Sequence, residues 1–504
     1  MQGCINACLL FRKGKIRLKF TFRLFIICLF TISISAQSRV TLTIDLNKPG
    51  RVIPKDFIGE SFETSSIRYS NREVKGYLFD STDHQLLTIF KNLGLRSLRI
   101  GGATVDHAKK VPELKDIDAL FHFAKAAGVK VIYTLRLTNG NAEYNASVAK
   151  YIWDHYRSLL DCFAIGNEPD WHSYHIEDPE IYETTPGIPG TAYPSYIAKW
   201  RRFAKAVLDL VPGAKFSGPN TGSNYPVPLA KDTGYNGKTW TVNFIDSEKN
   251  SGIISFFTQH NYVGQSTNDK TKDEVVNMML SSEWDTVNYP LLYHADCVPT
   301  LEAGFPFRLT ESNCFSEGID GASNTFATAL YALDYLHWWA VHNALGVNFH
   351  STQWRFNATI RHDAEGDILM NPMGYGIAAF NIGGHGNVIP VTIYNPDSLN
   401  LTSYAVLDSS YLYVTVINKE HGSTARNIDI TINTQNIWHN ASVIYLTAPE
   451  NNVYSKTGIT LGGAEITNDS LWHGRWSIIN IKDSVKLNLR VQASSAAIIK
   501  LLRQ

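Results

Sequence analysis

The sequence predicts an α/β protein, a (β/α)8 barrel followed by a C-terminal β-sandwich, and three observations support this fold class. Eight short apolar runs alternate with helical patterns between residues 56 and 386, a rhythm typical of a parallel barrel. No Gly-x-Gly-x-x-Gly fingerprint follows the first run, which disfavours an open sheet of the dinucleotide-binding type. Beyond residue 386, short alternating runs continue without a helical pattern, as expected of a sandwich.

The first strand is expected at 39–45, where apolar and polar residues alternate. A turn signal containing Pro-Gly follows it, so this strand stands apart from the barrel rhythm. We expect residues 37–55 to add a strand to the C-terminal sandwich, which would place both ends of the folded chain in the small domain.

The barrel is expected over residues 56–386. Its strands are short runs rich in β-branched and aromatic residues, whereas its helices are longer segments with apolar residues three and four positions apart. The expected strands are 57–63, 97–102, 129–137, 162–168, 215–220, 253–262, 307–312 and 346–351. The expected helices are 84–93, 114–127, 146–160, 196–210, 239–247, 274–285, 323–342 and 374–380.

The sandwich is expected over residues 387–504. Turn residues separate its alternating runs, which we predict to be strands. These runs are 388–394, 403–418, 426–433, 441–446, 477–481, 487–491 and 496–502.

The first 36 residues are typical of a secretory signal peptide. A basic region precedes an apolar run at 24–32, and small residues at 33–36 would suit cleavage. The apolar run is shorter than the ~20 residues that a spanning helix needs, although an uncleaved anchor is the alternative. We therefore expect a protein that is secreted, lysosomal or, from a bacterial source, periplasmic, with no stable membrane insertion after cleavage.

The mature chain would keep three of the six cysteines, Cys162, Cys297 and Cys314. An odd number allows at most one disulfide, and Cys297 with Cys314 is the more plausible pair. In a eukaryotic secreted protein some Asn-x-Ser/Thr sequons would carry glycans and lie at the surface. The sequons begin at Asn145, Asn357, Asn400, Asn440 and Asn468.

The charge balance restricts the partners. Lys and Arg together number 46, as do Asp and Glu, so the formal net charge is zero. This disfavours general nucleic-acid binding, which needs a basic face. It also weakens the case for a strongly polyanionic ligand, although a local basic cleft stays possible.

Two glutamates follow apolar strands at positions where barrel enzymes carry catalytic side chains. Glu168 ends the fourth predicted strand, after Ile165-Gly166-Asn167, and Glu311 ends the seventh. Parallel strands bring both residues to one face of a barrel. A pair of carboxyl groups across one bond is what glycoside hydrolysis needs, with Glu168 as acid/base and Glu311 as nucleophile. Two carboxylates and a water suffice for this reaction, so we expect no metal and no organic cofactor.

Other polar residues at strand ends are candidates for substrate binding. Each also has an ordinary structural interpretation, such as a satisfied core histidine, a loop acid or a packed indole. Arg99, at the end of the second strand, fits a buried ion-pair partner. The candidates for substrate binding are Asn167, His260, Tyr262, Asp106, Glu63, Gln353 and Trp354.

Several of these motifs resemble glycoside hydrolase family 79, which holds β-glucuronidases and heparanase. The segment 165–169 looks like the acid/base motif of retaining barrel glycosidases, and the runs 325–335 and 346–350 are the more specific part of the likeness. The resemblance covers most of the mature chain, including the sandwich. It implies hydrolysis of a terminal β-linked glucuronic acid, with Glu168 as acid/base and Glu311 as nucleophile.

Three alternatives stay open. A heparanase-like endo-β-glucuronidase acting on heparan sulfate would need basic clusters and an excised linker, and neither is evident in the sequence. A retaining glycosidase for neutral sugars would use the same two glutamates. A catalytically silent carbohydrate-binding protein would share the fold alone. Long loops expected at 169–194 and 289–305 would narrow the cleft and favour exo action.

Overall fold

The computed structural model describes residues 39–70, 75–171, 193–222, 236–264, 269–352, 355–362, 366–434, 440–480 and 486–502. The predicted leader at 1–36, most of the predicted loop at 169–194, and the candidates Gln353 and Trp354 lie outside these ranges. Among the described residues, no helix combines the length and the hydropathy needed to cross a membrane.

Eight strands form a closed barrel in chain order, and every neighbouring pair is parallel. This confirms the predicted fold class. Because all strands run the same way, their carboxyl ends meet at one face of the barrel. The strands are β2 (Ile58–Glu63), β3 (Ser97–Gly101), β4 (Lys130–Leu135), β5 (Leu160–Ile165), β6 (Phe216–Gly222), β7 (Ile254–Gly264), β8 (Phe307–Phe315) and β9 (Gly346–Ser351).

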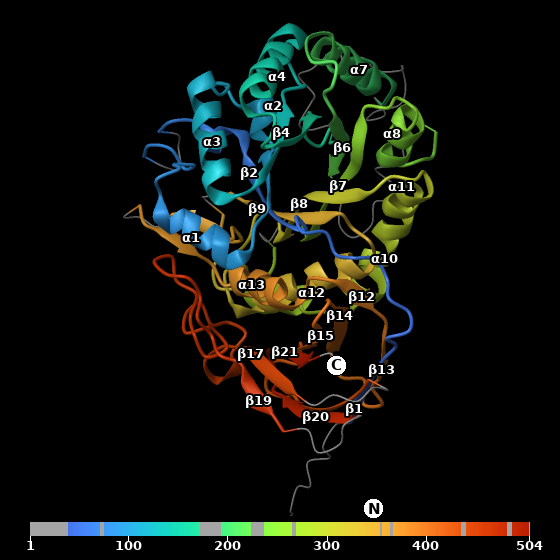
Figure 1. Ribbon diagram of the computed structural model, residues 1–504, viewed down its shortest axis with the longest axis vertical. Coiled ribbons are helices and arrows are strands. Elements are labelled where there is room, and N and C mark those ends of the chain that lie inside the picture. The colour runs from blue at the N-terminus through green and yellow to red at the C-terminus, as the bar shows by residue number, and fades with distance from the viewer. Residues whose placement is uncertain are drawn as a thin grey trace, which may run out of the picture. The chain divides into compact units, whose positions relative to one another are not determined.

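Helices surround the barrel (Figure 1). Helix α1 matches its predicted range because its ends carry local signals: Asp83 accepts two backbone N–H bonds at the start, and Gly94 takes a left-handed φ of 69° after the end. The helices are α1 (His84–Leu93), α2 (Thr104–His107), α3 (Leu114–Ala127), α4 (Ala142–Tyr156), α7 (Tyr193–Leu210), α8 (Trp240–Glu248), α9 (Lys272–Met279), α10 (Tyr289–Leu292), α11 (Val298–Glu302), α12 (Phe326–Val341) and α13 (Met373–Gly383).

Three predicted segments of the barrel region were wrong. The helix predicted at 274–285 is α9, which ends at Met279, six residues before the predicted end. Helix α4 begins four residues earlier than predicted because Asn141 caps its first turn by accepting the N–H of Tyr144. The predicted loop at 289–305 is largely helical, with α10 and α11 flanked by the π-helical turns η2 (Trp284–Asn288) and η3 (Tyr293–Cys297). This segment leads into the amino end of β8, so it lies away from the carboxyl-end face and cannot narrow a cleft there.

The C-terminal part contains two antiparallel-rich sheets that enclose a separate apolar core. The first sheet has the order β13-β1-β16-β20, and β1 lies in it between two strands from the far end of the sequence (Figure 1). Its strands are β1 (Arg39–Ile44), β13 (Val391–Tyr394), β16 (Ile428–Asn433) and β20 (Lys486–Val491). The second, seven-stranded sheet contains β12 (Asn387–Ile389), β14 (Leu401–Leu407), β15 (Tyr411–Asn418), β17 (Ala441–Thr447), β18 (Thr460–Leu461), β19 (Ser477–Ile479) and β21 (Ser495–Leu502).

Two runs predicted as single strands are each divided. The run 388–394 is interrupted at Pro390, which cannot donate to a sheet ladder, and its halves β12 and β13 belong to different sheets. The run 403–418 is the hairpin β14–β15, whose turn is capped by Asp408 accepting the N–H of Ser410 and Tyr411. Smaller elements are the hairpin β10 (Ile360–His362) with β11 (Ile368–Met370) and the 3₁₀ turns η1 (Thr64–Ile67) and η4 (Pro449–Asn451).

A buried ion triad joins the barrel helices to the sandwich. Lys419, which follows β15, lies 2.5 Å from an oxygen of Asp285 and 2.7 Å from an oxygen of Asp334. Asp334 on α12 also accepts hydrogen bonds from Thr402 and Tyr404 of β14. Burial and the charge of Asp334 raise the pKa of Asp285 to about 7.

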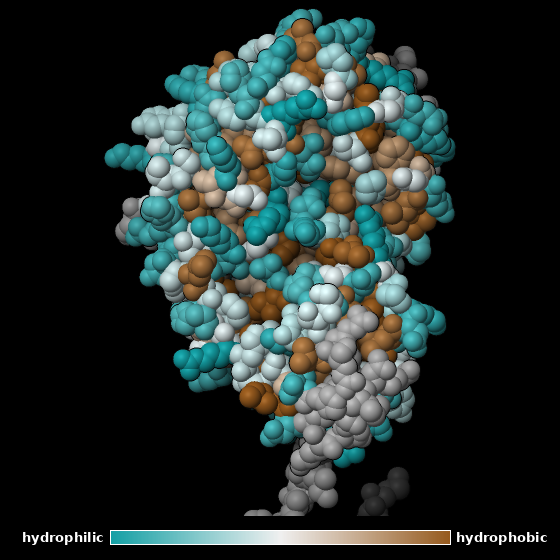
Figure 2. All heavy atoms as spheres, viewed as in Figure 1, coloured by the Kyte–Doolittle hydropathy of each residue, from teal (hydrophilic) through white to brown (hydrophobic). Residues whose placement is uncertain are grey.

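The predicted disulfide between Cys297 and Cys314 was wrong, because both thiols are free and buried, as is that of Cys162. Two sequon asparagines, Asn145 and Asn357, are also buried and donate to the backbone carbonyls of Arg136 and Phe315. On the face shown in Figure 2, small groups of apolar residues lie between hydrophilic ones.

Candidate active site

The segment after β5 places an amide and a carboxylate at the carboxyl-end face of the barrel. Gly166 has a φ of 78° and Glu168 a φ of 46°, so the chain turns through two left-handed conformations within three residues. The second is costly for a residue with a side chain, and such strain concentrates at functional sites. The turn is held by a hydrogen bond from the Glu168 N–H to the carbonyl oxygen of Asn220 on β6 (2.9 Å).

Asn167 is fixed from two sides. Its backbone N–H donates to Oδ2 of Asp106 (3.0 Å), and its side-chain oxygen accepts from the guanidinium of Arg99 (2.6 Å). The other oxygen of Asp106 accepts the N–H groups of Leu137 and Thr138. Asp106 therefore supports the backbone beneath Asn167, and the substrate contact expected of it stays a prediction.

Glu311 on β8 is held by two strong donors. The hydroxyl of Tyr262 donates to its Oε1 (2.9 Å), and the guanidinium of Arg99 lies 2.5 Å from its Oε2. Burial by itself would raise the pKa of the Glu311 carboxyl group. Electrostatic interactions with His350, His260 and Arg99, together with the tyrosine hydrogen bond, outweigh burial and hold this pKa well below its usual value. Glu311 is therefore an ionised carboxylate at neutral and mildly acidic pH.

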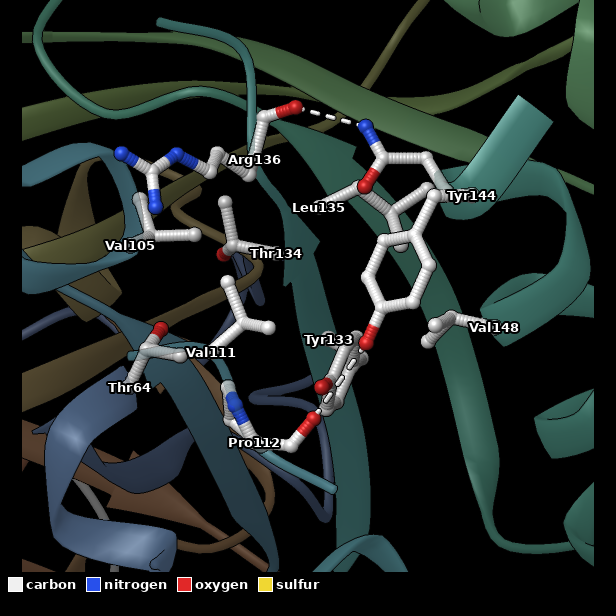
Figure 3. Close-up of a pocket in the computed structure, with 11 residues that line it drawn as sticks. Thr64, Val105, Val111, Pro112, Tyr133, Thr134, Leu135, Arg136, Tyr144 and Val148 are labelled. Carbon is white, nitrogen blue, oxygen red and sulfur yellow. Dashed lines mark hydrogen bonds between the residues drawn. The ribbon is translucent and has the colours of Figure 1, made fainter. Parts of the chain in front are cut away.

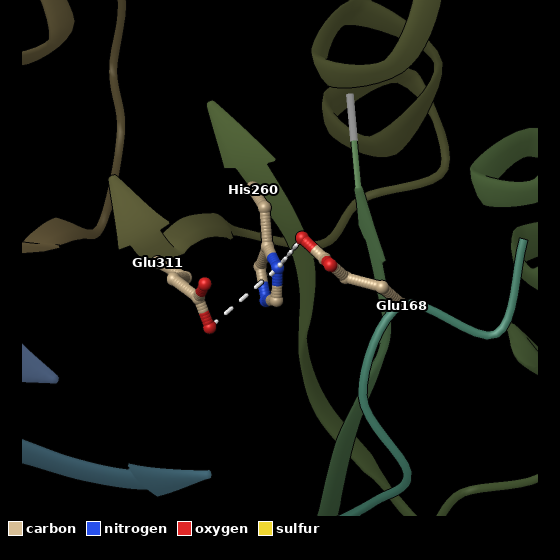
Figure 4. Close-up of side chains that lie close together, drawn as sticks. All are labelled: Glu168, His260 and Glu311. Atoms are coloured by element: carbon tan, nitrogen blue, oxygen red, sulfur yellow. Dashed lines mark hydrogen bonds and ion pairs between the residues drawn. The ribbon is translucent and has the colours of Figure 1, made fainter. Parts of the chain in front are cut away.

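Glu168, His260 and Glu311 lie together (Figure 4). Nδ1 of His260 is 3.0 Å from Oε1 of Glu168 and 3.9 Å from Oε2 of Glu311. One atom from each of the three side chains lies within 4.8 Å of the other two, so the carboxyl groups approach to that distance or less. His260 is fully buried, and its contacts orient the two glutamates.

The strands β2 and β9 contribute a group that the sequence analysis did not assign to the site. His350 on β9 lies 3.5 Å from Oε1 of Glu63 and 3.9 Å from Oε2 of Glu311, and its Nδ1 is 3.0 Å from the hydroxyl of Ser61. The other oxygen of Glu63 accepts the backbone N–H and the hydroxyl of Thr104. Its position in the sequence could have suggested this role, because His350 also lies near the carboxyl end of a strand.

The structure thus brings together Asn167, Glu168, His260, Tyr262 and Glu311, with Glu63 at the edge of the group. Arg99 fits its predicted role as a buried ion-pair partner, and its partner is Glu311.

A small cavity lies outside the barrel, between β4 and α4 (Figure 3). Its volume is about 30 Å³, room for about two water molecules, and far below the ~300 Å³ at which ligand pockets begin. Tyr133 and Thr134 line it from the strand, and Tyr144 and Val148 line it from the helix. The cavity therefore suits buried water and not a sugar.

Glu168, His260 and Glu311 are also of residue types that bind divalent cations. The guanidinium of Arg99 occupies one oxygen of Glu311 at 2.5 Å. The Arg99 guanidinium would repel a metal ion at short range. The site therefore suits a neutral or partly cationic sugar ring better than a divalent cation.

No protein-family model matches the chain, and no curated protein gives a significant match. Solved structures match its fold. A 4-O-α-L-rhamnosyl-β-D-glucuronidase from Fusarium oxysporum 12S superposes with a TM-score of 0.68 at 17% identity, over 92% of this chain and 100% of that one. An arabinofuranosidase of glycoside hydrolase family 51 from Xanthomonas axonopodis pv. citri gives 0.64 at 13% identity, also over 92% and 100%. CelM2, a bifunctional glucanase-xylanase from a metagenome library, gives 0.62 at 15% identity, over 92% and 99%. At these identities the similarity establishes a shared fold.

Proposed function

We propose that the chain is a retaining glycoside hydrolase that removes terminal β-linked glucuronic acid from glycans or glycosides. The observation that carries the proposal is the approach of Glu168 and Glu311 to within 4.8 Å across one face of the barrel. Retaining enzymes hold their two carboxyl groups ~5–5.5 Å apart, whereas inverting enzymes separate them by ~6.5–9.5 Å to admit a water.

The reaction proceeds in two displacements. In the first, an oxygen of Glu311 attacks the anomeric carbon, the glycosidic C–O bond breaks, and protonated Glu168 gives its proton to the leaving oxygen. In the second, Glu168 takes a proton from water, whose oxygen attacks the anomeric carbon and releases Glu311. The sugar leaves with its original anomeric configuration.

The residues around the two glutamates have different roles in this reaction. Arg99 and Tyr262 hold Glu311 ionised and fix both of its oxygens. His260 contacts Glu168 and can exchange a proton with it as its role alternates. Asn167, which precedes Glu168, shares the guanidinium of Arg99 with Glu311 and suits a bond to the sugar 2-hydroxyl, a contact that strengthens in the transition state.

Glucuronic acid as the sugar rests on two supports. The motifs around Glu168, Glu311 and strand β9 resemble the glucuronidase family, and one solved structure of similar fold is a glucuronidase. The sequence of the leader supports action outside the cytoplasm, which we propose as the place where such glycans are met.

A neutral pyranoside or arabinofuranoside is the second candidate, and Glu63 favours it. This carboxylate adds a second negative charge near Glu311, and the nearby guanidinium of Arg99 is already engaged by Glu311 and Asn167. A uronate carboxylate close to Glu63 would be repelled, whereas a sugar hydroxyl could donate to it.

A panel of aryl β-glucuronide, glucoside, xyloside and galactoside and α-arabinofuranoside tests the proposal. We expect turnover of the glucuronide, and its loss in the Glu311→Gln variant with the fold retained by circular dichroism. The exposed Glu302→Gln on α11 is the matched control and should keep wild-type activity. Turnover of a neutral glycoside alone would establish the second candidate. Equal inertness of wild type and Glu311→Gln on every glycoside would support a binding protein.

A further inference from the structure

His350 lies between two carboxylates, and it has no role in the double displacement proposed for Glu168 and Glu311. Its Nε2 lies 3.5 Å from Glu63 and its Nδ1 lies 3.9 Å from Glu311. It comes from β9, whereas the carboxylates come from β2 and β8 on either side of that strand. The side chain is 8% exposed, so solvent screens these interactions little.

We propose that His350 is a positioning residue that, held as an imidazolium by Glu63, keeps the Glu311 carboxylate ionised in acid and so sets the acidic limb of the pH–activity profile. This inference rests on the proposed function, because it assigns Glu311 the part of nucleophile.

The charges that face His350 favour its protonated form. Glu311 on β8 and Glu63 on β2 attract the imidazolium, while Arg99 on β3 opposes it. Glu60, also on β2, interacts with it electrostatically. Burial lowers the pKa of His350, but the two nearby carboxylates outweigh burial and raise it above its usual value.

The hydrogen bonds around the imidazole fit this charge state. An imidazolium has two N–H donors, and two acceptors face them: Glu63 at Nε2 and the hydroxyl of Ser61 at Nδ1. Ser61 also accepts from the guanidinium of Arg99 at 3.2 Å. The positive charges of Arg99 and His350 therefore converge on Oε2 of Glu311, while Tyr262 binds Oε1.

Glu63 acts through His350. Its Oε2 is satisfied by the backbone N–H and hydroxyl of Thr104, which fixes the carboxylate in place. Its Oε1 meets His350, the one cationic partner found for Glu63 among the ion pairs of the described chain. Removing the charge of Glu63 should therefore lower the proton affinity of His350, and the nucleophile would lose part of its neighbouring positive charge.

The pH dependence of kcat/KM tests the proposal on whichever glycoside the enzyme turns over. In His350→Gln the acidic limb should move up by about one to three pH units, because an opposite charge at this range lowers a carboxyl pKa by about that much. Glu63→Gln should not move it up, because at the acidic pH where Glu311 titrates His350 is protonated with or without Glu63. The double variant should match His350→Gln alone. His385→Gln, which removes an exposed histidine paired with Asp408 at 3.4 Å, is the matched control and should leave the limb unchanged.

Titration of the His350 imidazole by NMR gives a readout that needs no activity. We expect a midpoint above that of a free histidine in the wild type, and a fall in both Glu63→Gln and Glu311→Gln. A midpoint at or below that of free histidine, or one unmoved by both variants, would overturn the proposal even if His350→Gln does not fold. An acidic limb at the same pH in wild type and His350→Gln would also overturn it. Inactivity on every glycoside would refute the proposed function and leave the NMR result to decide whether His350 and Glu311 are coupled.

Discussion

Replacing Glu60 by Gln should make the protein more stable at pH 8. It should also make the free energy of unfolding less dependent on pH. Glu60 lies in the barrel interior on β2, is fully buried, and accepts a hydrogen bond from Ser351 (2.9 Å). Burial raises its pKa from the usual 4.5 to about 8, against the opposing hydrogen bonds of Ser351 and Thr359. The folded protein therefore binds a proton that the unfolded chain releases above pH 4.5.

The sign of the effect follows from this raised pKa. The stability that Glu60 contributes is complete below pH 4.5 and is lost as the pH rises toward 8. At about 1.4 kcal/mol per pH unit, the loss over this interval reaches about 5 kcal/mol as an upper bound. Glutamine fills nearly the same volume and carries no charge, so the unfolding free energy of the variant should lack the part of its pH dependence that Glu60 causes. Asp285, whose pKa is raised from 3.8 to about 7, contributes a slope of the same sign in both proteins, which ends near pH 7.

Urea unfolding at pH 5, 6.5 and 8 measures the effect in wild type and Glu60→Gln. We expect similar free energies of unfolding at pH 5 and a variant that is more stable by a few kcal/mol at pH 8. Parallel pH curves for the two proteins, or a variant that is equally destabilised at every pH, would refute the assignment of Glu60 as a buried neutral acid.

Three further predictions concern other parts of the molecule. Arg99→Met should lower kcat/KM by about 100-fold or more, because it misplaces both Glu311 and Asn167; steady-state kinetics would show this, and near wild-type activity would contradict it. Lys419→Met should lower the free energy of unfolding by about 3–5 kcal/mol at pH 8, because two buried aspartates lose their cation. The loss should be smaller at pH 5, where Asp285 is protonated. Urea unfolding at both pH values measures the two losses, and a larger loss at pH 5 would contradict the prediction. Expression in a eukaryotic host should leave Asn145 and Asn357 without glycans because both side chains are buried, and a glycopeptide at either position in the mass spectrum would argue against this packing.

The barrel could be predicted because each strand is short, apolar and bounded by turn or cap signals, so pattern alone locates it. The meeting of the two candidate glutamates followed from the same logic. Glu168 follows β5 and Glu311 lies within β8, and parallel strands place their carboxyl-end side chains on one face. No distance was needed to expect that the two residues meet.

Roles that depend on which atoms are already satisfied could not be predicted. Asp106 has the residue type and position of a sugar ligand, but it accepts three backbone N–H groups, which give it a structural role. His350 gained its place only when Glu63 and Glu311 were found on both sides of it.

The segment between α9 and β8 shows a second limit. We expected a loop at 289–305, yet it forms short helical turns, with Pro290 and Pro299 in the first turns of α10 and α11. Its aromatic side chains pack against the barrel helices, with Tyr289 against Tyr335 and Trp338. Tertiary packing here outweighs the local turn signals.

The stereochemistry of the first product tests the central claim most directly. Proton NMR of the anomeric signal, recorded during hydrolysis of the aryl β-glycoside that the enzyme turns over, distinguishes the two outcomes before mutarotation mixes the anomers. The approach of Glu168 and Glu311 to within 4.8 Å predicts that the β-anomer appears first. Initial release of the α-anomer would mean inversion and would contradict the double displacement through Glu311.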